Sequence, residues 1–267
     1  GLNSKTGYEV MNMNLGAMHN TPGDVGSYGL LYQWGRKDPF PAAPTLTGTT
    51  ATVGAPIYDG DNNEIKITNS SQSSTADNNL AIANPTVCLS NYAQFNTSRD
   101  WLQADMSNDA LWGNPKGAER NETNDFLNKG AKSFYDPCPV GWRVPPADVF
   151  RNFTASGGYA WVIDDFDIAD ISGDGAKSLA DYDYGWTFNL SDSASSYFPA
   201  AARFDGSYAM LMGSMSGLWG SYWGNAPYPG DMFQGGAYSV LSFQIKDTAG
   251  NEMITTSPAG GGARADA

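Results

Sequence analysis

Hydrophobic and polar positions alternate in short runs along this chain. Residues 8–15 alternate in part and residues 28–34 form a short aromatic run, so we expect strands close to the N-terminus. Later runs with the same strand character are residues 184–189, 197–204, 217–223 and 238–245. The pattern predicts a chain built mainly from short strands.

Helical periodicity is rare. Residues 146–153 fit a short helix, because Pro146 suits a first helical turn, Asp148 favours the N-terminal end of the helix dipole, and Val149 and Phe153 lie one turn apart. Residues 118–130 fit a helix less well. With so few helices, we expect an α+β fold that is β-rich and loop-rich.

Residues 41–80 differ from their surroundings, because they are rich in Pro, Thr, Ser and Asn. We interpret this stretch as a surface insertion within a single domain that covers residues 1–267. Asp59–Glu64 has the composition of a hairpin turn inside it. Long surface loops cost little to close, so deleting the insertion is expected to leave a folded remainder.

Composition and charge narrow the class of protein. The 267 residues include 31 Gly, 15 Pro, 14 Tyr and 8 Trp, and only 16% are charged, which is typical of extracellular loop-rich proteins. The net charge of −13 repels phosphate backbones, so we expect no nucleic-acid partner. No apolar run approaches the ~18 residues of a transmembrane helix, so the chain is not expected to span a membrane.

The run 135–146, YDPCPVGWRVPP, is the most informative segment. Its four prolines fix φ and remove backbone donors, so neither a helix nor a central strand passes through it. Such a rigid segment forms either a scaffold corner or a binding surface. As a corner, it predicts a largely buried Trp142 and an Arg143 bound to backbone carbonyls or a carboxylate.

Eight segments stand out along the chain: residues 10–17, 29–40, 82–86, 100–101, 111–113, the run 135–146, and residues 197–201 and 220–223. In this order they resemble the Fibrobacter succinogenes major paralogous domain. That domain is common in surface lipoproteins and in fimbrillin-like pilus-tip or adhesion proteins of Bacteroidetes. The resemblance implies an extracellular or bacterial cell-surface location, in a fimbria or at the outer membrane, with other pilus or surface-protein subunits as partners.

The order of the proline run, a short helix and glycine- and tryptophan-rich strands is also similar to C-type-lectin-like and formylglycine-generating-enzyme-like domains. By analogy we expect that irregular architecture. The resembled family closes on a strand whose cysteine can partner the one at position 138, and this chain stops short of it at Ala267. We therefore expect a truncated C-terminus and a longer precursor whose leader and anchor lie outside this sequence.

Cys88 and Cys138 are too few for a disulfide framework or a zinc cluster. Two interpretations stay open: the two thiols pair with each other, or Cys88 is a small buried hydrophobic residue.

Catalytic signals are weak. His19 is the only histidine, which excludes a two-histidine metal site, and no G-x-S-x-G elbow is present to hold a serine nucleophile. Carboxylates are abundant, but the sequence does not indicate which of them converge on a sugar cleft. We therefore expect no enzyme, and keep a carbohydrate-active module as an alternative.

Residues 170–181 match a twelve-residue calcium loop. The oxygen ligands would come from Asp170, Ser172, Asp174, the carbonyl of Ala176, and Asp181, with Gly175 at the turn. Lys177 occupies a position that is normally apolar, and no helices clearly flank the loop. An ordinary acidic turn is the alternative, so calcium is the one cofactor that the sequence suggests.

Aromatic residues gather near the C-terminus. Trp219, Tyr222, Trp223 and Tyr228 could stack on sugars or anchor a protein, or they could fill the core. Together with the resemblance, they predict an adhesion or fimbrial module that binds host, bacterial or glycan ligands without catalysis. A purely structural surface subunit is a further alternative.

Overall fold

The computed structural model describes residues 2–4, 6–42, 58–64, 68–71, 78–90, 101–102, 111–113, 131–205, 210–211, 215–227, 237–246 and 251–263. Strands predominate, and the helices are few and short. This confirms the β-rich fold class. Among the described residues, no helix has both the length and the apolar character needed to cross a membrane.

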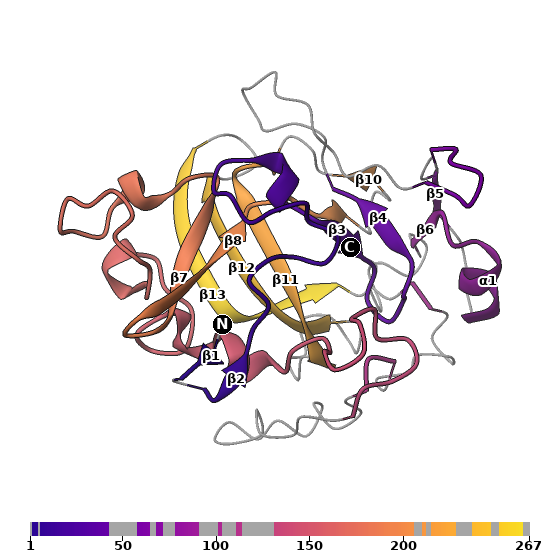
Figure 1. Ribbon diagram of the computed structural model, residues 1–267, viewed down its shortest axis with the longest axis horizontal. Coiled ribbons are helices and arrows are strands. Elements are labelled where there is room, and N and C mark those ends of the chain that lie inside the picture. The colour runs from indigo at the N-terminus through magenta and orange to yellow at the C-terminus, as the bar shows by residue number, and fades with distance from the viewer. Residues whose placement is uncertain are drawn as a thin grey trace.

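The largest sheet holds three antiparallel strands in the order β11-β12-β13: β11 (Trp219–Pro227), β12 (Ala237–Lys246) and β13 (Glu252–Ala263). The hairpin of β7 (Gly185–Ser191) and β8 (Ala194–Pro199) lies beside this sheet (Figure 1). Four of these five strands coincide with the predicted strand-like runs. The sequence pattern missed β13, because its second half, residues 258–263, reads Pro-Ala-Gly-Gly-Gly-Ala and has no large apolar side chain.

The opposite end of the molecule carries the smaller elements (Figure 1). There β3 (Leu30–Tyr32) pairs with β4 (Pro39–Pro41), and β5 (Thr68–Ser71) runs parallel to β6 (Val87–Ser90) with α1 (Asn78–Ala83) between them. Two further pairs are short: β1 (Leu2–Asn3) with β2 (Tyr8–Glu9), and β9 (Phe204–Asp205) with β10 (Met210–Leu211). The predicted strand 8–15 is therefore regular only over its first two residues.

The helix predicted over residues 146–153 is present as the 3₁₀-helix η6 (Ala147–Phe153), with Pro146 at its N-cap. Three single-turn 3₁₀-helices are η1 (Val25–Ser27), η7 (Ile163–Asp165) and η8 (Leu179–Asp181). The weaker helical candidate, 118–130, lies outside the described residues.

Among the described residues, the largest fully buried side chains of the core are aromatic. One cluster joins η6, β7, β8 and β12, where Phe153 and Phe188 stack with ring centroids 4.2 Å apart. A second cluster contains three fully buried tryptophans, Trp34, Trp101 and Trp112. Burying rings of this size supplies much of the stability of a fold that has little regular structure.

Arg36, from the segment 29–40, is a buried cation beside this second cluster. Its guanidinium donates to Asp38 (2.7 and 3.0 Å), to the Gln33 side chain (3.1 Å) and to the carbonyls of Val87 (2.7 Å) and Asn84 (3.2 Å). All five N–H groups are thereby used, which is the condition for burying this charge.

The predicted insertion at 41–80 is described only in part. Asp59–Glu64 is a turn closed by an isolated antiparallel bridge between Tyr58 and Glu64, as predicted. The strand β5 is anchored by its pairing to β6, whose Cys88 and Leu89 are buried. Residues 43–57, 65–67 and 72–77 lie outside the described part of the chain.

Candidate functional site

Two neighbouring cavities, of about 330 and 150 Å³, form what we call the aromatic groove. They are adjacent, since they share several lining residues: Asn14, Leu15, Cys138, Pro145, Tyr222 and Trp223. The total volume lies within the range of small-ligand sites.

Three segments that are distant in sequence line this groove: the N-terminal segment 8–15, the proline corner 138–146, and Tyr222 and Trp223 of β11. The first cavity also reaches Val149 and Phe150 of η6, and the second reaches Tyr28, Tyr32 and Trp112. The lining is therefore mainly apolar and aromatic, with isolated polar groups.

The aromatic rings of the groove are held in place by hydrogen bonds. The Trp223 indole donates to the carbonyl of Tyr32 (2.9 Å), and its ring meets Trp112 edge-on at 6.3 Å. The Tyr222 hydroxyl donates to the Pro199 carbonyl (2.6 Å). Such fixed aromatic surfaces lose little entropy when they bind a ligand.

The corner keeps its shape through Asp136, whose side chain is fully buried. One carboxylate oxygen accepts from the backbone N–H of Cys138 (2.8 Å) and from the Lys132 ammonium (2.8 Å), and the other accepts from the N–H of Val144 (2.9 Å). The corner is tied to β11, because the N–H of Asn225 donates to the carbonyl of Pro145 (2.8 Å).

Trp142, which was predicted to be largely buried, keeps part of its surface exposed. Its side chain is half-buried and lines the groove together with Arg143. The proline run turns through the hydrogen bond from the N–H of Trp142 to the carbonyl of Pro139 (3.0 Å), and this turn leaves the indole at the cavity instead of in the core. The corner is thus both a scaffold and part of a surface.

Burial raises the pKa of the titratable groups in the groove. Burial, followed by the negative charge of Asp136, raises the pKa of the Cys138 thiol to about 12. Burial also raises the pKa of Tyr32 to about 12 and that of Tyr222 well above its ordinary value. These three groups stay protonated at neutral pH, so the centre of the groove is uncharged.

Both cysteines are free thiols. Cys88 is fully buried and accepts a hydrogen bond from the Gln33 amide at 3.7 Å, which supports its interpretation as a small buried hydrophobic residue. His19 lies at the surface, where its ring is 3.6 Å from the Asp24 carboxylate.

Of the four predicted ligand-binding aromatics, the structure brings Tyr222 and Trp223 together. Trp219 lies apart from them, where its indole donates to Ser242 (3.0 Å) and Arg203 stacks on its ring at 4.2 Å. Tyr228 lies outside the described residues. Sequence reasoning missed the contribution of residues 8–15, because nothing in their pattern indicates a contact with β11 some two hundred residues later.

The predicted calcium loop forms two linked turns. Asp170 accepts from Ser172 Oγ (3.2 Å) and from the N–H groups of Gly173 (2.6 Å) and Gly175 (2.9 Å), and Gly175 has the positive φ of 84° that its turn requires. Asp181 accepts from the N–H of Ser172 (3.0 Å), so Asp170, Ser172 and Asp181 lie together.

The other predicted ligands of this loop do not take part in these contacts. Asp174 accepts from the N–H of Ala176 (2.8 Å) within its own turn, and Asp181 also caps η8 through the N–H of Ser178 (3.0 Å). Burial raises the pKa of Asp181, but the backbone N–H groups that it accepts from outweigh this effect and lower the pKa below its ordinary value. No cluster of three or more His, Cys, Asp or Glu side chains suited to a metal ion occurs in the described part of the chain.

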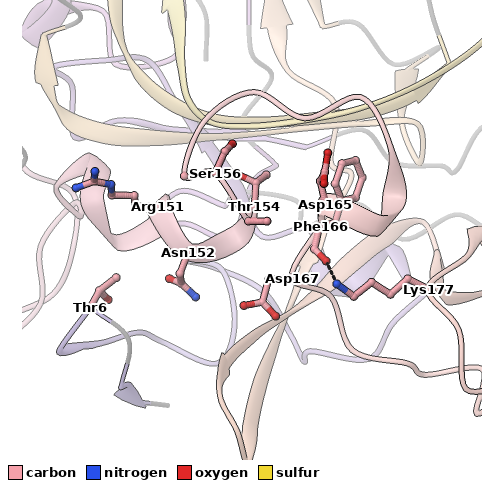
Figure 2. A pocket seen from close by; sticks show the side chains of 11 residues that line it. Thr6, Arg151, Asn152, Thr154, Ser156, Asp165, Phe166, Asp167 and Lys177 are labelled. Atoms are coloured by element: carbon pink, nitrogen blue, oxygen red, sulfur yellow. Dashed lines mark hydrogen bonds between the residues drawn. The ribbon is translucent and has the colours of Figure 1, made fainter. Parts of the chain in front are cut away.

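A second, polar pocket of about 510 Å³ lies between η6 and residues 170–181, which we call the acidic loop (Figure 2). Its charged lining residues are Arg151, Asp165, Asp167 and Lys177. The Lys177 ammonium donates to the carbonyls of Phe166 (2.5 Å) and Asp164 (3.3 Å), which ties the acidic loop to η7.

Comparisons of this chain with protein-family models, with curated proteins and with solved structures found no significant match.

Proposed function

We propose that this protein is an adhesion-type module of the bacterial cell surface that binds a ligand in the aromatic groove without catalysing a reaction. The observation that carries the proposal is the groove itself. Rings from β11 and from the proline corner line two adjacent, mainly apolar cavities, and hydrogen bonds hold Tyr222 and Trp223 in position. Apolar, aromatic concave surfaces with few polar groups are typical of binding sites.

The chemistry of the groove favours binding over catalysis. Cys138 is its one thiol, and a pKa of about 12 keeps that thiol protonated and a poor nucleophile at neutral pH. The tyrosines are likewise neutral, and the only histidine contacts Asp24 at the surface. The residues that line the groove therefore supply contact area and few groups for proton transfer.

The eight ordered motifs support membership of the Fibrobacter succinogenes major paralogous domain family, with a C-type-lectin-like or formylglycine-generating-enzyme-like arrangement of strands. The short elements, the 3₁₀-helix after the proline corner and the aromatic core are consistent with this proposal. Membership of this family implies an extracellular location in a fimbria or at the outer membrane, with other pilus or surface subunits as partners.

We also propose that residues 170–181 bind calcium. The support is that Ser172 contacts both carboxylates: its Oγ donates to Asp170 and its backbone N–H donates to Asp181. Calcium accepts carboxylate, hydroxyl and carbonyl oxygens together, so Asp174 and the carbonyl of Ala176 would complete the set after a small rearrangement of their turn.

The binding proposal is tested with the purified chain on arrays of extracellular-matrix proteins, bacterial surface proteins and glycans, together with a panel of glycosidase substrates. Binding without turnover is expected. Turnover would favour the carbohydrate-active alternative, and a response in neither assay would favour a structural subunit.

Variants assign any binding to the groove. Met13, 38% exposed at its wall, is changed to Glu, which places a charge in the mainly apolar groove. Val140→Ser is the matched control, because Val140 belongs to the same corner, is 97% exposed and does not line the groove. Loss of binding in Met13→Glu alone supports the proposal, and equal binding by both variants contradicts it.

A further inference from the structure

Two aromatic rings project into solvent from the loop that follows η6. Of the eight tryptophans, Trp161 alone is more than half exposed, at 61%, and Tyr159 is 51% exposed. Their ring centroids lie 4.8 Å apart, with the planes inclined at 46°. Val162 beside them is 55% exposed, so the loop presents a small contiguous apolar surface. Surfaces of this kind usually serve recognition, because exposing large rings forfeits the stabilisation of burial.

Hydrogen bonds hold this loop rigid. At its base, the Thr154 hydroxyl donates to the carbonyl of Gly158 (2.7 Å), and the N–H of Ala155 donates to the carbonyl of Asp165 (2.8 Å). Between the two rings, Ala160 exchanges a pair of backbone hydrogen bonds with Thr256 of β13 (2.9 and 3.0 Å). The rings are therefore presented by a preorganised loop, which reduces the entropy cost of binding.

The polar pocket opens beneath the same loop. Figure 2 shows the backbone between Ser156 and Asp165 arching along one side of the pocket, with Arg151 and Lys177 at opposite ends. Gly157 lies against the Arg151 side chain, since a Cβ built on it would be 3.0 Å from Arg151 Cγ. The same loop thus carries the aromatic pair at positions 159 and 161 and lines the pocket with Ala155, Ser156, Gly157 and Asp165, and we call the pocket and the pair together the loop site.

The charges of the loop site are balanced. Arg151 and Lys177 contribute two positive charges, and Asp165 and Asp167 contribute two negative ones. Such a lining offers both donors and acceptors but no net attraction for an ion. The chain as a whole carries a net charge of −13, which disfavours polyanionic ligands.

These features fit a sugar ring. A pyranose has an apolar face of weakly positive C–H groups, which matches the negative face of an indole or phenol ring, and a rim of hydroxyls that both donate and accept. We infer that the loop site binds a neutral glycan, with one ring on Trp161 and Tyr159 and its hydroxyls in the pocket beside Arg151 and Asp165.

This inference rests on the proposed binding function and names a ligand class for a different face of the molecule. The test is titration calorimetry of the full chain with neutral oligosaccharides of glucose, mannose, galactose and N-acetylglucosamine, and with sialylated and sulfated counterparts. At least one neutral series is expected to bind, and the anionic counterparts are expected to bind more weakly.

Variants then locate the site. Trp161→Ala is expected to weaken binding ~10-fold or more, because a central aromatic contact dominates a small interface. Asp165→Asn removes one negative charge and is expected to weaken binding less. Tyr58→Ala is the matched control, because Tyr58 is 53% exposed on the separate 58–64 turn, and its loss should leave the affinity unchanged. All three side chains are exposed, so the melting temperatures should stay close to that of the parent.

Three results would overturn the inference: no binding of any neutral glycan, equal affinity in Trp161→Ala, or tighter binding of the anionic series. The groove variant Met13→Glu distinguishes a failure of the loop-site inference from a failure of the proposed binding function. If Met13→Glu abolishes glycan binding and Trp161→Ala does not, the protein is a binding module and the loop site is not its glycan site.

Discussion

Replacing Asp136 by Asn should destabilise the protein strongly, although the two side chains have almost the same shape. The carboxylate accepts from two backbone N–H groups and one ammonium, at 2.8–2.9 Å, from a fully buried position. An asparagine has one carbonyl oxygen, so it can satisfy the N–H of Cys138 or that of Val144, but not both. Its amide nitrogen would face the other N–H as a second donor.

The magnitude follows from these contacts. Losing one hydrogen bond to a charged acceptor and leaving a buried donor unsatisfied costs about 1.5–3 kcal/mol. The ion pair with Lys132 adds about 0–1 kcal/mol, because the Lys132 side chain is 32% exposed and solvent screens the pair. The expected loss is therefore about 2–4 kcal/mol, and a loss of about 3 kcal/mol would lower the melting temperature by roughly 6–12 °C.

Urea unfolding followed by tryptophan fluorescence measures this loss as a shift in midpoint at constant slope. Lys132→Met should lose less than about 1 kcal/mol, and Val140→Ser, 97% exposed in the same run, should change almost nothing. If Asp136→Asn unfolds within about 0.5 kcal/mol of the parent, the corner is not held by this carboxylate.

Three further predictions concern the corner, its thiol and the acidic loop. Trp142→Ala should cost only about 1–2 kcal/mol, because the partly exposed indole leaves a smaller cavity than a core tryptophan; a loss of about 4 kcal/mol or more in urea unfolding would show that this indole contributes as much as a core tryptophan. Stability should fall as the pH rises from about 9 to about 12, because the folded-state pKa values of Cys138, Tyr28 and Tyr32, each about 12, exceed their ordinary values of 9.0 and 10.0. The stabilisation is complete below pH 9 and is lost as the folded groups titrate, and a flat melting temperature across pH 9–12 would contradict it. Calcium should raise the melting temperature by binding the native state, by about 2.7 kcal/mol of stability at a hundred times its dissociation constant, and Asp174→Ala should remove the shift; a flat calorimetric trace at millimolar calcium makes the segment an ordinary acidic turn.

Local patterns determined much of the secondary structure. Aromatic, strand-like runs predicted β7, β8, β11 and β12, because the preference of aromatic residues for strands is a property of the residue type. Pro146 and Asp148 predicted η6 for a similar reason, since capping preferences act within one turn. The turn at 59–64 was also predictable from neighbouring residues, whereas the sequence left open whether Cys88 is a free, buried thiol.

Tertiary structure alone decided where the candidate sites lie. The groove needs residues 8–15, 138–146 and 222–223 side by side, and no local signal links segments that are so far apart in the chain. Trp142 and Trp161 have the same intrinsic preference for the core as Trp34 and Trp101, yet the first lies half-buried, the second is 61% exposed and the last two are fully buried. Hydrophobicity favours burial without specifying a place, and which ring remains at the surface depends on how the loops close around a core that is already filled.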